Sequence, residues 1–442
     1  MNFVNKEALL AIFLEHRSVC TDTRKIARGD LFFALKGGNF NGNAFAAKAL
    51  DAGAVFAVID EPAFAVAEDD RYLLVEDVLK ALQDLAHAYR KQLSTTIFGL
   101  TGSNGKTTTK ELLAAVLSVE KKVFATQGNF NNHIGVPLTL LAIPPDAEIA
   151  IVEMGTNQPG DIPELVAMAE PDYGLITNIG KAHLERLGSQ DGIQYEKGAL
   201  FRYVKKEGKG IFVNELDWRV VEEAEGAPQK FTYGASSSLC KGRVVEMSLE
   251  GMKMEVEHAA WGQKAMFNSS LGGEYNFLNI LAAISVGVHF GVSLSAIQEG
   301  IASYQSSNNR SQLVQCGPYQ LWLDAYNANP SSMKAAIGHI LSHNPKKVAV
   351  ILGDMFELGE ASQAEHQAIG VLLNENPPGL FIGIGPEMEL AVAVYQGEKY
   401  AFQDVKAASE KLADILKGMD TILIKGSRGM ALERLVQVIA PS

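Results

Sequence analysis

The sequence predicts an α/β protein of several domains. A chain of 442 residues is longer than one hydrophobic core can serve, since domains average ~150 residues. From residue 95 onward, short apolar runs alternate with helical patterns, which is typical of parallel sheets covered on both faces. A glycine-rich turn joins the first of these runs to a helix. We expect a small N-terminal α/β domain (1–92), a central P-loop-type domain with a mostly parallel sheet (93–307) and a Rossmann-like C-terminal α/β domain (308–442).

The composition indicates a cytoplasmic enzyme. Hydrophobic residues make up 47% of the chain and charged residues 20%, as in soluble globular proteins. The sequence has no apolar run of the ~20 residues that span a bilayer, and its first residues do not resemble a signal peptide. The cysteines Cys20, Cys240 and Cys316 are odd in number and far apart, which disfavours a disulfide framework or a zinc site. The net charge of −12 argues against nucleic-acid binding.

The N-terminal region reads as a helix followed by strands within 30–35 and 54–59. A polar loop rich in glycine and asparagine, 36–42, separates these strands, and residues 78–90 have helical spacing. In the central region, buried strands are expected at 95–98, 149–152, 173–177 and 210–213. The alternating pattern around 244–256, with a turn at Glu250-Gly251, predicts an antiparallel hairpin.

The polar stretch 304–310 predicts a linker to the last domain. Beyond it, the apolar runs 320–323, 348–352, 380–384 and 421–425 predict a second parallel sheet. Ligands of such sheets bind at the carboxyl ends of the strands, often between domains.

The turn at residues 99–109 carries the strongest chemical signal. Its glycines let the backbone curl so that N–H groups and the start of the next helix face an anion. Lys106 can then reach the outer phosphates of a nucleotide, and the Thr107 hydroxyl can ligate Mg²⁺. Leu100 stands where the usual motif has its first glycine. The expected nucleotide contacts are Gly102, Ser103, Asn104, Gly105, Lys106, Thr107 and Thr108.

Three further side chains follow predicted strands or helices of the central region. Glu153 ends the run 149–152 and could hold the Mg²⁺ that bridges nucleotide phosphates. His183, shortly after 173–177, could ligate a second metal. Lys197, taken alone, reads as a lysine on the surface of a helix.

Three loops combine polar side chains with turn-forming residues. The segment 128–137 is dense in amides that could hydrogen-bond a polar substrate, although a plain connector is an equal reading. The segments 324–332 and 425–429 follow strands and are candidate binding loops, with helix-capping turns as the alternative.

Together these segments resemble the Mur ligase family, whose members form amide bonds with ATP during peptidoglycan precursor synthesis. The likeness covers essentially the whole chain. It includes the phosphate loop without its first glycine, the segment 128–137, the segment 178–183 with 187–189, and Asn276-Phe-Leu-Asn279.

Within the family, the third-domain strings resemble those of members that join D-alanyl-D-alanine to UDP-N-acetylmuramoyl-tripeptide. These strings are 326–330 with 332–333, 352–360 with His366, and 425–430. The Asp-Asn-Pro-Arg string of the preceding ligase of the pathway does not occur in this sequence. The resemblance implies ATP, two Mg²⁺ ions and an acyl-phosphate intermediate. The sequence leaves the oligomeric state open, and we expect a monomer.

The resemblance also implies roles for individual residues. Lys106 and Thr107 would hold the ATP phosphates and a first Mg²⁺ shared with Glu153, while His183 and a carbamylated Lys197 would hold the second. Arg310 would contact the γ-phosphate, Asn276 and Asn279 the adenosine side, and Asp324 the ribose. The implied substrate contacts are Asp22, Thr23, Arg24, Lys36, Gly37, Asn41, Asn129, Asn131, Asn132, His133, Tyr326, Asn327, Asn329, Lys425, Ser427 and Arg428.

The chain departs from the family pattern at two positions. Members often carry Glu two residues after the carbamylated lysine, where this chain has Ala199, and His-Asn where it has Tyr275-Asn276. Three other interpretations stay open, of which the departures favour only the second. They are a sibling or folylpolyglutamate-type ligase that uses another amine, a nucleotide-binding scaffold without catalysis, and a P-loop kinase.

Overall fold

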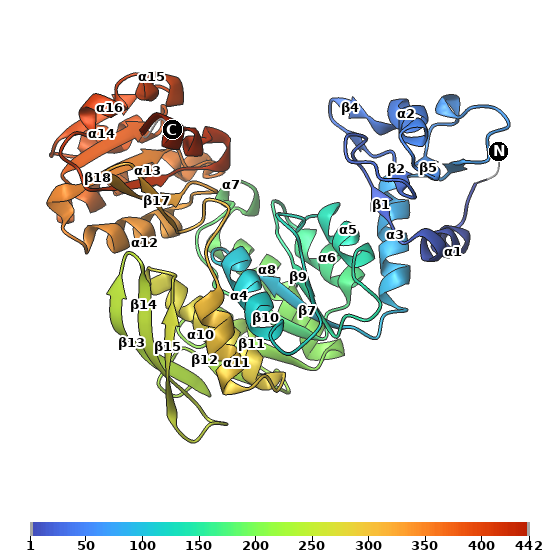
Figure 1. Ribbon diagram of the computed structural model, residues 1–442, viewed down its shortest axis with the longest axis horizontal. Helices are drawn as coiled ribbons and strands as arrows, with labels where there is room; N and C mark the ends of the chain where they lie inside the picture. Colours follow the sequence, from blue (N-terminus) through green and yellow to red (C-terminus); the bar gives the residue numbers. More distant parts are fainter. Residues whose placement is uncertain (1–2, 440–442) are drawn as a thin grey trace.

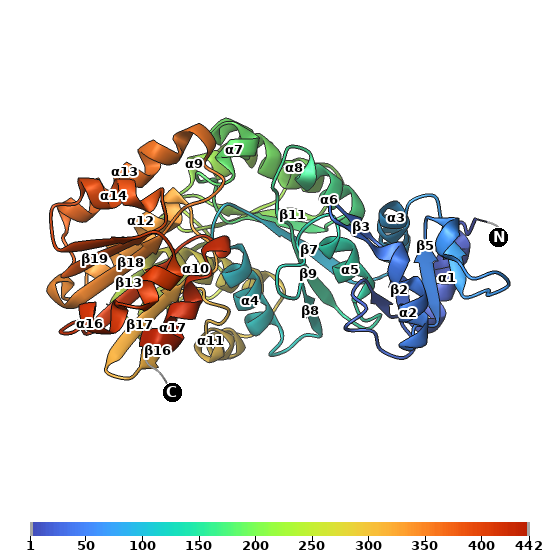
Figure 2. The ribbon, with the colours of Figure 1, turned by 90° about the horizontal axis from the view of Figure 1, so that it is seen from above.

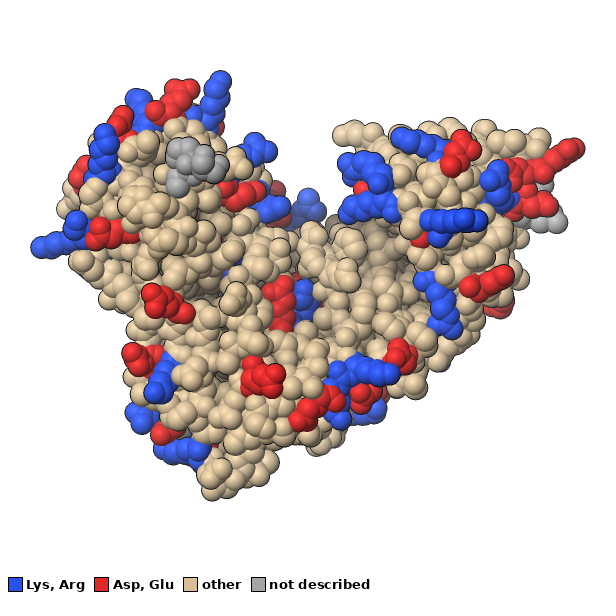
Figure 3. All heavy atoms as spheres, in the orientation of Figure 1, with Lys and Arg blue, Asp and Glu red and all other residues tan. Residues whose placement is uncertain are grey.

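The computed structural model describes residues 3–439 and has three lobes (Figure 1). The N-terminal and C-terminal lobes rise from the central lobe and face each other across an open cleft (Figure 3). The predicted α/β class with a largely parallel central sheet is confirmed. Among the described residues, no helix combines the length and the apolar character needed to cross a bilayer.

The N-terminal lobe is built on a four-stranded parallel sheet with the order β1-β2-β5-β6. Its strands are β1 (Val19–Cys20), β2 (Leu31–Phe33), β5 (Phe56–Ile59) and β6 (Tyr72–Leu74). A separate antiparallel pair, β3 (Lys36–Gly37) and β4 (Phe40–Asn41), lies within the predicted polar loop. The helices are α1 (Lys6–His16), α2 (Ala46–Asp51) and α3 (Val78–Arg90), with short 3₁₀ turns η1 (Gly42–Phe45) and η2 (Pro62–Phe64).

The central lobe carries a nine-stranded sheet with the order β15-β14-β13-β12-β11-β10-β7-β9-β8. All neighbours from β12 to β8 pair in parallel, whereas β13, β14 and β15 pair antiparallel with one another. The strands are β7 (Thr96–Thr101), β8 (Val123–Ala125), β9 (Ile149–Glu153), β10 (Tyr173–Ile176), β11 (Gly210–Asn214), β12 (Lys230–Tyr233), β13 (Cys240–Ser248), β14 (Gly251–His258) and β15 (Lys264–Ser269). The predicted hairpin is thus present, and a third strand that the sequence reading missed extends it.

Helices cover both faces of this sheet because its strands alternate apolar side chains between the two faces. Ile97 of β7 lies in one core with residues of α3, α5, α6 and α8, while the next residue, Phe98, lies in a second core with α4, α10 and α11. The helices of the lobe are α4 (Lys106–Leu117), α5 (Gly135–Leu141), α6 (Asp161–Ala169), α7 (Leu184–Leu187), α8 (Gln190–Glu207), α9 (Trp218–Glu223), α10 (Glu274–His289) and α11 (Leu294–Ser303).

The C-terminal lobe has a six-stranded sheet with the order β16-β17-β21-β18-β19-β20, parallel except for the edge pair β16–β17. The strands are β16 (Gln312–Cys316), β17 (Tyr319–Asp324), β18 (Val348–Gly353), β19 (Leu380–Ile384), β20 (Lys399–Phe402) and β21 (Thr421–Lys425). The helices are α12 (Pro330–Leu341), α13 (Ser362–Glu375), α14 (Met388–Val394), α15 (Val405–Ser409), α16 (Leu412–Ile415) and α17 (Leu435–Ile439), with 3₁₀ turns η3 (Pro345–Lys347), η4 (Gly359–Ala361), η5 (Arg428–Met430) and η6 (Leu432–Arg434).

The lobes differ in how they join. One continuous core contains Leu9 and Phe13 of α1, α3 and the strands of the central sheet, so the N-terminal lobe shares packing with the central lobe. The C-terminal lobe instead has two cores of its own, one on each face of its sheet. Among the partly buried residues, Leu184 of α7 and Leu249 of the β13–β14 turn reach one of these cores from the central lobe. Seen from above, the C-terminal lobe stands beside α7 and α10 (Figure 2), which contact η4 and α12 respectively.

Candidate functional site

A cavity of about 640 Å³ lies between the central and C-terminal lobes. Its walls come from the loops that follow β7, β9 and β10 on one side and β17, β18 and β21 on the other. Because parallel strands end at the same edge of a sheet, each sheet presents its carboxyl-end loops to this one space. The cavity is therefore the candidate functional site.

The phosphate loop joins β7 to α4 and forms one wall of the cavity. Gly102 and Gly105 have φ angles of +150° and +77°, a region that favours glycine. A Cβ at Gly102 would lie 1.9 Å from Oγ1 of Thr177, so only glycine fits there. The helix begins at Lys106, inside the segment 99–109 that the sequence predicts as a turn. Lys106, Thr107 and Thr108 line the cavity.

The loop after β10 holds the phosphate loop in place. Oγ1 of Thr177 donates to the Asn104 carbonyl oxygen at 2.6 Å, and the Asn104 N–H donates to Oδ1 of Asn178 at 3.0 Å. The Ser103 hydroxyl donates to the Gly180 carbonyl oxygen at 2.9 Å. These bonds fix the backbone of the phosphate loop while its helix N-terminus faces the cavity.

Lys106 folds back over its own loop, with Nζ donating to the Gly102 carbonyl oxygen at 2.7 Å. Burial lowers the pKa of its ammonium group, Glu153 opposes this shift, and Arg310 adds to it. A phosphate between Lys106 and Arg310 would meet two cations and the N–H groups of α4. This wall of the cavity therefore suits a polyanion.

Glu153 is buried at the end of β9, not solvated as an isolated strand-end carboxylate would be. Its Oε1 accepts from Nδ2 of Asn131 at 2.8 Å and from Oγ1 of Thr107 at 3.3 Å. Its Oε2 has no hydrogen-bond partner within the part of the chain that the structure describes. A buried carboxylate oxygen without a partner beside a threonine hydroxyl fits an oxygen-ligated divalent cation.

Lys197 lies on α8 and is completely buried, so its interpretation as a surface lysine was wrong. The reason is that α8 packs against the central sheet with this face inward. Its Nζ has no hydrogen-bond partner among residues 3–439. Burial lowers the pKa of this amine well below its ordinary value, and the nearby Lys106 lowers it further, while Glu196 opposes the shift.

His183 and Glu357 meet across the lobes. Nδ1 of His183, in front of α7, lies 2.5 Å from Oε2 of Glu357, in the loop after β18. This close contact with His183 lowers the pKa of the Glu357 carboxyl. The Glu185 N–H also donates to the Glu357 carbonyl oxygen at 3.1 Å. Both His183 and Glu357 line the cavity.

On the C-terminal side, aromatic and basic groups stack. The Arg310 guanidinium lies 3.6 Å from the ring centre of Tyr326, and Arg428 approaches the same ring at 5.3 Å. Nε of Arg310 is buried and, within residues 3–439, has no hydrogen-bond partner. The Arg428 side chain is largely exposed and lies 3.8 Å from Glu433. Arg310 and Arg428 are thus two further anion-binding groups of the cavity.

Asp324 and Lys425 end the neighbouring strands β17 and β21 and form an ion pair of 2.6 Å. Lys425 also donates to the Asn327 carbonyl oxygen at 3.0 Å. Ser427 is buried, and its Oγ accepts the Phe356 N–H at 2.8 Å. These contacts are structural in the described chain, although all five residues line the cavity.

Asn329 connects the two lobes directly. Its Oδ1 caps α12 by accepting the Ser332 N–H at 2.9 Å, and its Nδ2 donates to Oδ1 of Asn104 in the phosphate loop at 2.8 Å. A capping residue of the C-terminal lobe therefore contacts the phosphate loop of the central lobe.

The amide side chains at the base of α10 bond to protein groups. Nδ2 of Asn279 donates to Oδ1 of Asn276 at 3.0 Å, and Oδ1 of Asn279 accepts from Oγ1 of Thr109 at 3.1 Å. The hydroxyl groups of Tyr275 and Ser311 are 2.7 Å apart. Asn276, Asn279 and Tyr275 all line the cavity.

The residues of the loop 128–134 differ in whether they line the cavity. Asn129, Asn131 and Asn132 line the cavity, whereas His133 is exposed and does not. Oδ1 of Asn132 accepts the Gly135 N–H at 2.8 Å and so stabilises the start of α5. The His133 carbonyl oxygen accepts from Gln83 at 3.2 Å.

The N-terminal candidates lie apart from this cavity, on the lobe across the cleft (Figure 3). Asp22 and Arg24 form a bidentate pair, and the hydrogen bonds from Arg24 lower the pKa of Asp22 to about 2. Arg24 and Gly37 are exposed, and Thr23 is partly exposed. The open cleft therefore separates this group of residues from the cavity.

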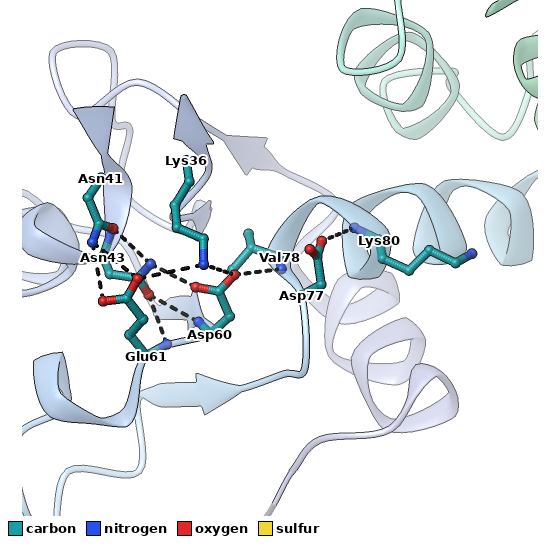
Figure 4. A network of polar contacts seen from close by, with 8 residues as sticks. All are labelled: Lys36, Asn41, Asn43, Asp60, Glu61, Asp77, Val78 and Lys80. Atoms are coloured by element: carbon teal, nitrogen blue, oxygen red, sulfur yellow. Dashed lines mark hydrogen bonds and ion pairs between the residues drawn. The ribbon is translucent and has the colours of Figure 1, made fainter. Parts of the chain in front are cut away.

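The loop carrying Lys36 and Asn41 is held by a buried amide that the sequence reading missed (Figure 4). Asn43 accepts the Asp60 N–H at 3.0 Å and donates to Oδ1 of Asp60 at 2.8 Å. It also donates to Oδ1 of Asn41 at 3.0 Å, while Nζ of Lys36 lies 3.1 Å from Asp60 and Nδ2 of Asn41 donates to Glu61 at 3.2 Å. The three asparagines within 39–43 could have indicated this network from the sequence, because asparagine side chains commonly fix turns by hydrogen-bonding nearby groups.

Comparisons with known proteins give the same family for all three lobes of the chain. Three family profiles match: Mur ligase family, catalytic domain, at residues 15–90, Mur ligase middle domain at 100–287, and Mur ligase, glutamate ligase domain, at 309–428. UDP-N-acetylmuramoyl-tripeptide–D-alanyl-D-alanine ligase of Bacillus subtilis is 36% identical over 440 residues, covering 96% of this chain and 93% of that relative.

The chain belongs to the Mur ligase family. Solved Mur ligases also share its architecture. MurF from Acinetobacter baumannii superposes with a TM-score of 0.87 at 31% identity, covering 96% of this chain and 93% of that one. MurF from Thermotoga maritima, solved in complex with ADP, gives a TM-score of 0.84 at 28% identity, covering 96% and 97%. The resemblance inferred from the motifs is thereby confirmed.

This Mur ligase departs from the family pattern at two residues, one buried in a helix and one in the wall of the cavity. Ala199 is buried in α8, two residues beyond Lys197. Tyr275 lies at the cavity wall with its hydroxyl on Ser311. Membership in this ligase family disfavours the P-loop kinase interpretation.

Proposed function

We propose that this Mur ligase joins D-alanyl-D-alanine to UDP-N-acetylmuramoyl-tripeptide at the expense of ATP, in the cytoplasm, as a step of peptidoglycan precursor synthesis. One observation carries the proposal. The phosphate loop and the strand-end loops of the C-terminal lobe line a single cavity, where a phosphorylated group and an incoming amine can meet. The name of the full-length Bacillus subtilis relative specifies the two substrates.

The three domains divide the substrates between them. Residues 1–92 bind the uridine diphosphate part through Asp22, Thr23, Arg24, Lys36, Gly37 and Asn41. Residues 93–307 bind ATP, with Asn276 and Asn279 toward adenosine, and the loop 128–134 guides the peptide. Residues 308–442 bring in D-alanyl-D-alanine and contact ATP through Arg310 and Asp324. One chain supplies all these groups, which supports action as a monomer.

The reaction runs in two steps. The tripeptide carboxylate attacks the γ-phosphorus of ATP, so that an acyl phosphate forms and ADP leaves. The amine of the dipeptide then attacks the acyl carbon and expels phosphate. Both reactants of the first step are anions, so Lys106 and Arg310 stabilise the transition state by neutralising charge. Holding the two substrates side by side lowers the entropic barrier further.

Glu153 and Thr107 are suited to hold a first Mg²⁺. The orphaned Oε2 of Glu153 is the observation that supports this fit. Among the described residues, no three His, Cys, Asp or Glu side chains form a cluster able to hold a metal alone, so phosphate oxygens would complete the coordination. When bound, Mg²⁺ neutralises phosphate charge and polarises the bond that breaks.

We further propose that Lys197 is carbamylated and, with His183, holds a second Mg²⁺. A neutral amine can add CO₂, and burial of Lys197 favours the neutral amine. The carbamate would turn a buried amine, which has no hydrogen-bond partner among the described residues, into an anionic oxygen ligand.

The proposal is tested by measuring phosphate release with ATP, Mg²⁺ and UDP-N-acetylmuramoyl-tripeptide, with and without D-alanyl-D-alanine. Release that depends on the dipeptide, together with a pentapeptide product detected by mass, is the expected result. A preference for a single amino acid in place of the dipeptide would favour a sibling ligase instead. ATP binding without substrate-dependent release would favour a catalytically inactive scaffold.

A further inference from the structure

We infer that Glu357 receives the ammonium group of the incoming amine substrate. This inference rests on the proposed ligase function and names a residue for its second substrate. D-alanyl-D-alanine carries an α-amino group, and the ordinary pKa of such groups, ~7.7–8.0, leaves much of it protonated at neutral pH. A cavity that admits this amine beside ATP therefore needs a carboxylate that other cations have not neutralised.

The carboxylates of the cavity differ in whether a cation of the protein already neutralises them. Those that line it are Glu153, Asp324 and Glu357. Asp324 is paired with Lys425 at 2.6 Å, and Glu153 is buried against Thr107 and Asn131 with Lys106 nearby. Glu357 has no Lys or Arg within ion-pair distance in the part of the chain that the structure describes. His183 contacts it directly, and Arg186 acts on it only from beyond ion-pair distance.

Glu357 also keeps one carboxylate oxygen available. Oε2 contacts His183, whereas Oε1 takes part in none of the hydrogen bonds or ion pairs of residues 3–439. Its side chain is about half exposed, at 49%, and it lines the cavity. An ammonium group can therefore bind Oε1 without displacing His183.

The backbone around Glu357 is held in a strained conformation. Its φ angle is +63°, a left-handed value that is uncommon for residues other than glycine. Such strain persists only where the surroundings enforce it, and it is concentrated at functional sites. Here the surroundings are two buried side chains: the Met355 N–H donates to Nε2 of His366 at 3.0 Å, and the Phe356 N–H donates to Oγ of Ser427 at 2.8 Å.

His366 is completely buried, and its Nδ1 lies 2.8 Å from the Ser362 carbonyl oxygen. Because Nε2 accepts a backbone N–H, the proton of the neutral ring sits on Nδ1. The loop is thus fixed from both sides, and its one projecting carboxylate faces the cavity. This rigid presentation suits recognition of a small cation.

The position matches the chemistry of the second step. Glu357 belongs to the C-terminal lobe, which we propose brings in the dipeptide, and it touches His183 of the lobe that holds the phosphates. An amine on Glu357 would therefore lie on the wall between the two substrates.

The test compares the variants Glu357→Gln and Glu357→Asp with the native protein. We expect Glu357→Gln to raise the KM for D-alanyl-D-alanine about 10- to 100-fold, as loss of a charge-assisted bond does, with the KM values for ATP and tripeptide unchanged. Glu357→Asp keeps the charge and should recover part of the loss. The exposed neighbour Glu360, changed to Gln, serves as the matched control.

Hydroxylamine provides the second readout. It traps acyl phosphates as hydroxamates and is uncharged at neutral pH, so Glu357→Gln should form hydroxamate at the native rate. An unchanged KM for the dipeptide, or a parallel fall in ligation and hydroxamate formation, would overturn the inference, because Glu357 would then act only on His183 or on the first step. Native protein that forms neither hydroxamate nor pentapeptide would instead overturn the proposed function itself.

Discussion

Nζ of Lys425 lies 2.6 Å from Oδ2 of Asp324, which joins the ends of β21 and β17 at the floor of the cavity. Both groups are taken out of water, since the Lys425 side chain is only 2% exposed and that of Asp324 15%. Removing one partner of such a pair leaves an uncompensated buried charge.

We expect Asp324→Asn to lower the free energy of unfolding by about 3 kcal/mol, measured by urea unfolding. The surface pair Asp414–Lys417 offers a control, because Asp414→Asn should leave stability unchanged within error. Equal effects in the two variants would contradict the importance of burial for this pair.

Lys106→Ala should abolish ligation, with a loss of at least ~10³-fold in kcat, because the cation beside the γ-phosphate is removed. Among the described residues, the side chain hydrogen-bonds only its own loop, so the circular dichroism spectrum and the melting temperature should stay close to native. Lys122→Ala, at a surface ion pair, is the matched control. Near-normal turnover in Lys106→Ala would be incompatible with the proposed mechanism.

Lys197→Met should retain the fold, since Met fills the same buried space, but lose activity about 100-fold or more if a metal ligand is removed. Native protein supplied with ¹³C-labelled bicarbonate should show a carbamate signal in its NMR spectrum, and Lys197→Met should not. Full activity of the native protein without any carbamate signal would disprove carbamylation.

His339 gives a pH dependence whose sign follows from its burial. Its ring packs 4.7 Å from that of Trp322, and both ring nitrogens are without hydrogen-bond partners in the described chain. Burial, and then the nearby His343, lower its pKa to about 4. The unfolded state therefore binds more protons between pH 4 and about 6.5, so stability falls as the pH drops through this window.

From pH 7.5 to pH 5, His339 should cost the native protein about 2 kcal/mol of stability. His339→Phe lacks this contribution. The difference in unfolding free energy between the native protein and the variant, measured with urea, should therefore change by that amount between pH 7.5 and pH 5. Parallel pH profiles for the two proteins would show that His339 does not titrate as described.

Asn43→Asp should disturb the loop of Lys36 and Asn41, because a carboxylate cannot donate to Oδ1 of Asp60 and would repel it. We expect a loss of about 2 kcal/mol in stability and a several-fold higher KM for the uridine diphosphate substrate, with the KM for ATP unchanged. The exposed strand residue Asn268, changed to Asp, is the control. An unaltered KM for the uridine substrate would separate this loop from substrate binding.

The sequence predicts best what neighbouring residues determine. The turn around Gly102 and Gly105, the helix 78–90 and the alternating hairpin depend on local geometry, and the structure has all of them. The helix pattern alone wrongly indicated a surface position for Lys197, because its burial depends on which face of α8 meets the sheet. The contact between His183 and Glu357 depends on how two lobes are placed, which no local pattern encodes.

Short edge strands were missed for a related reason. β8 and β20 have three and four residues, partly or largely exposed, and they are ordered by pairing with a longer neighbour. Their residues alone give little periodic signal. Asn43 likewise resembles any loop asparagine until its partners Asp60 and Asn41 are known.

The C-terminal lobe has cores of its own. Moving it relative to the central lobe therefore disrupts less packing than moving the N-terminal lobe. The N-terminal lobe cannot swing as a rigid body without repacking α3 against α5 and α6, since these helices share one core. The C-terminal lobe is tied to its neighbour by small contacts, such as Leu184, Leu249 and the pairs His183–Glu357 and Lys181–Glu365. We therefore expect reactants to enter the cavity through movement of the C-terminal lobe, while the other two lobes stay together as one frame.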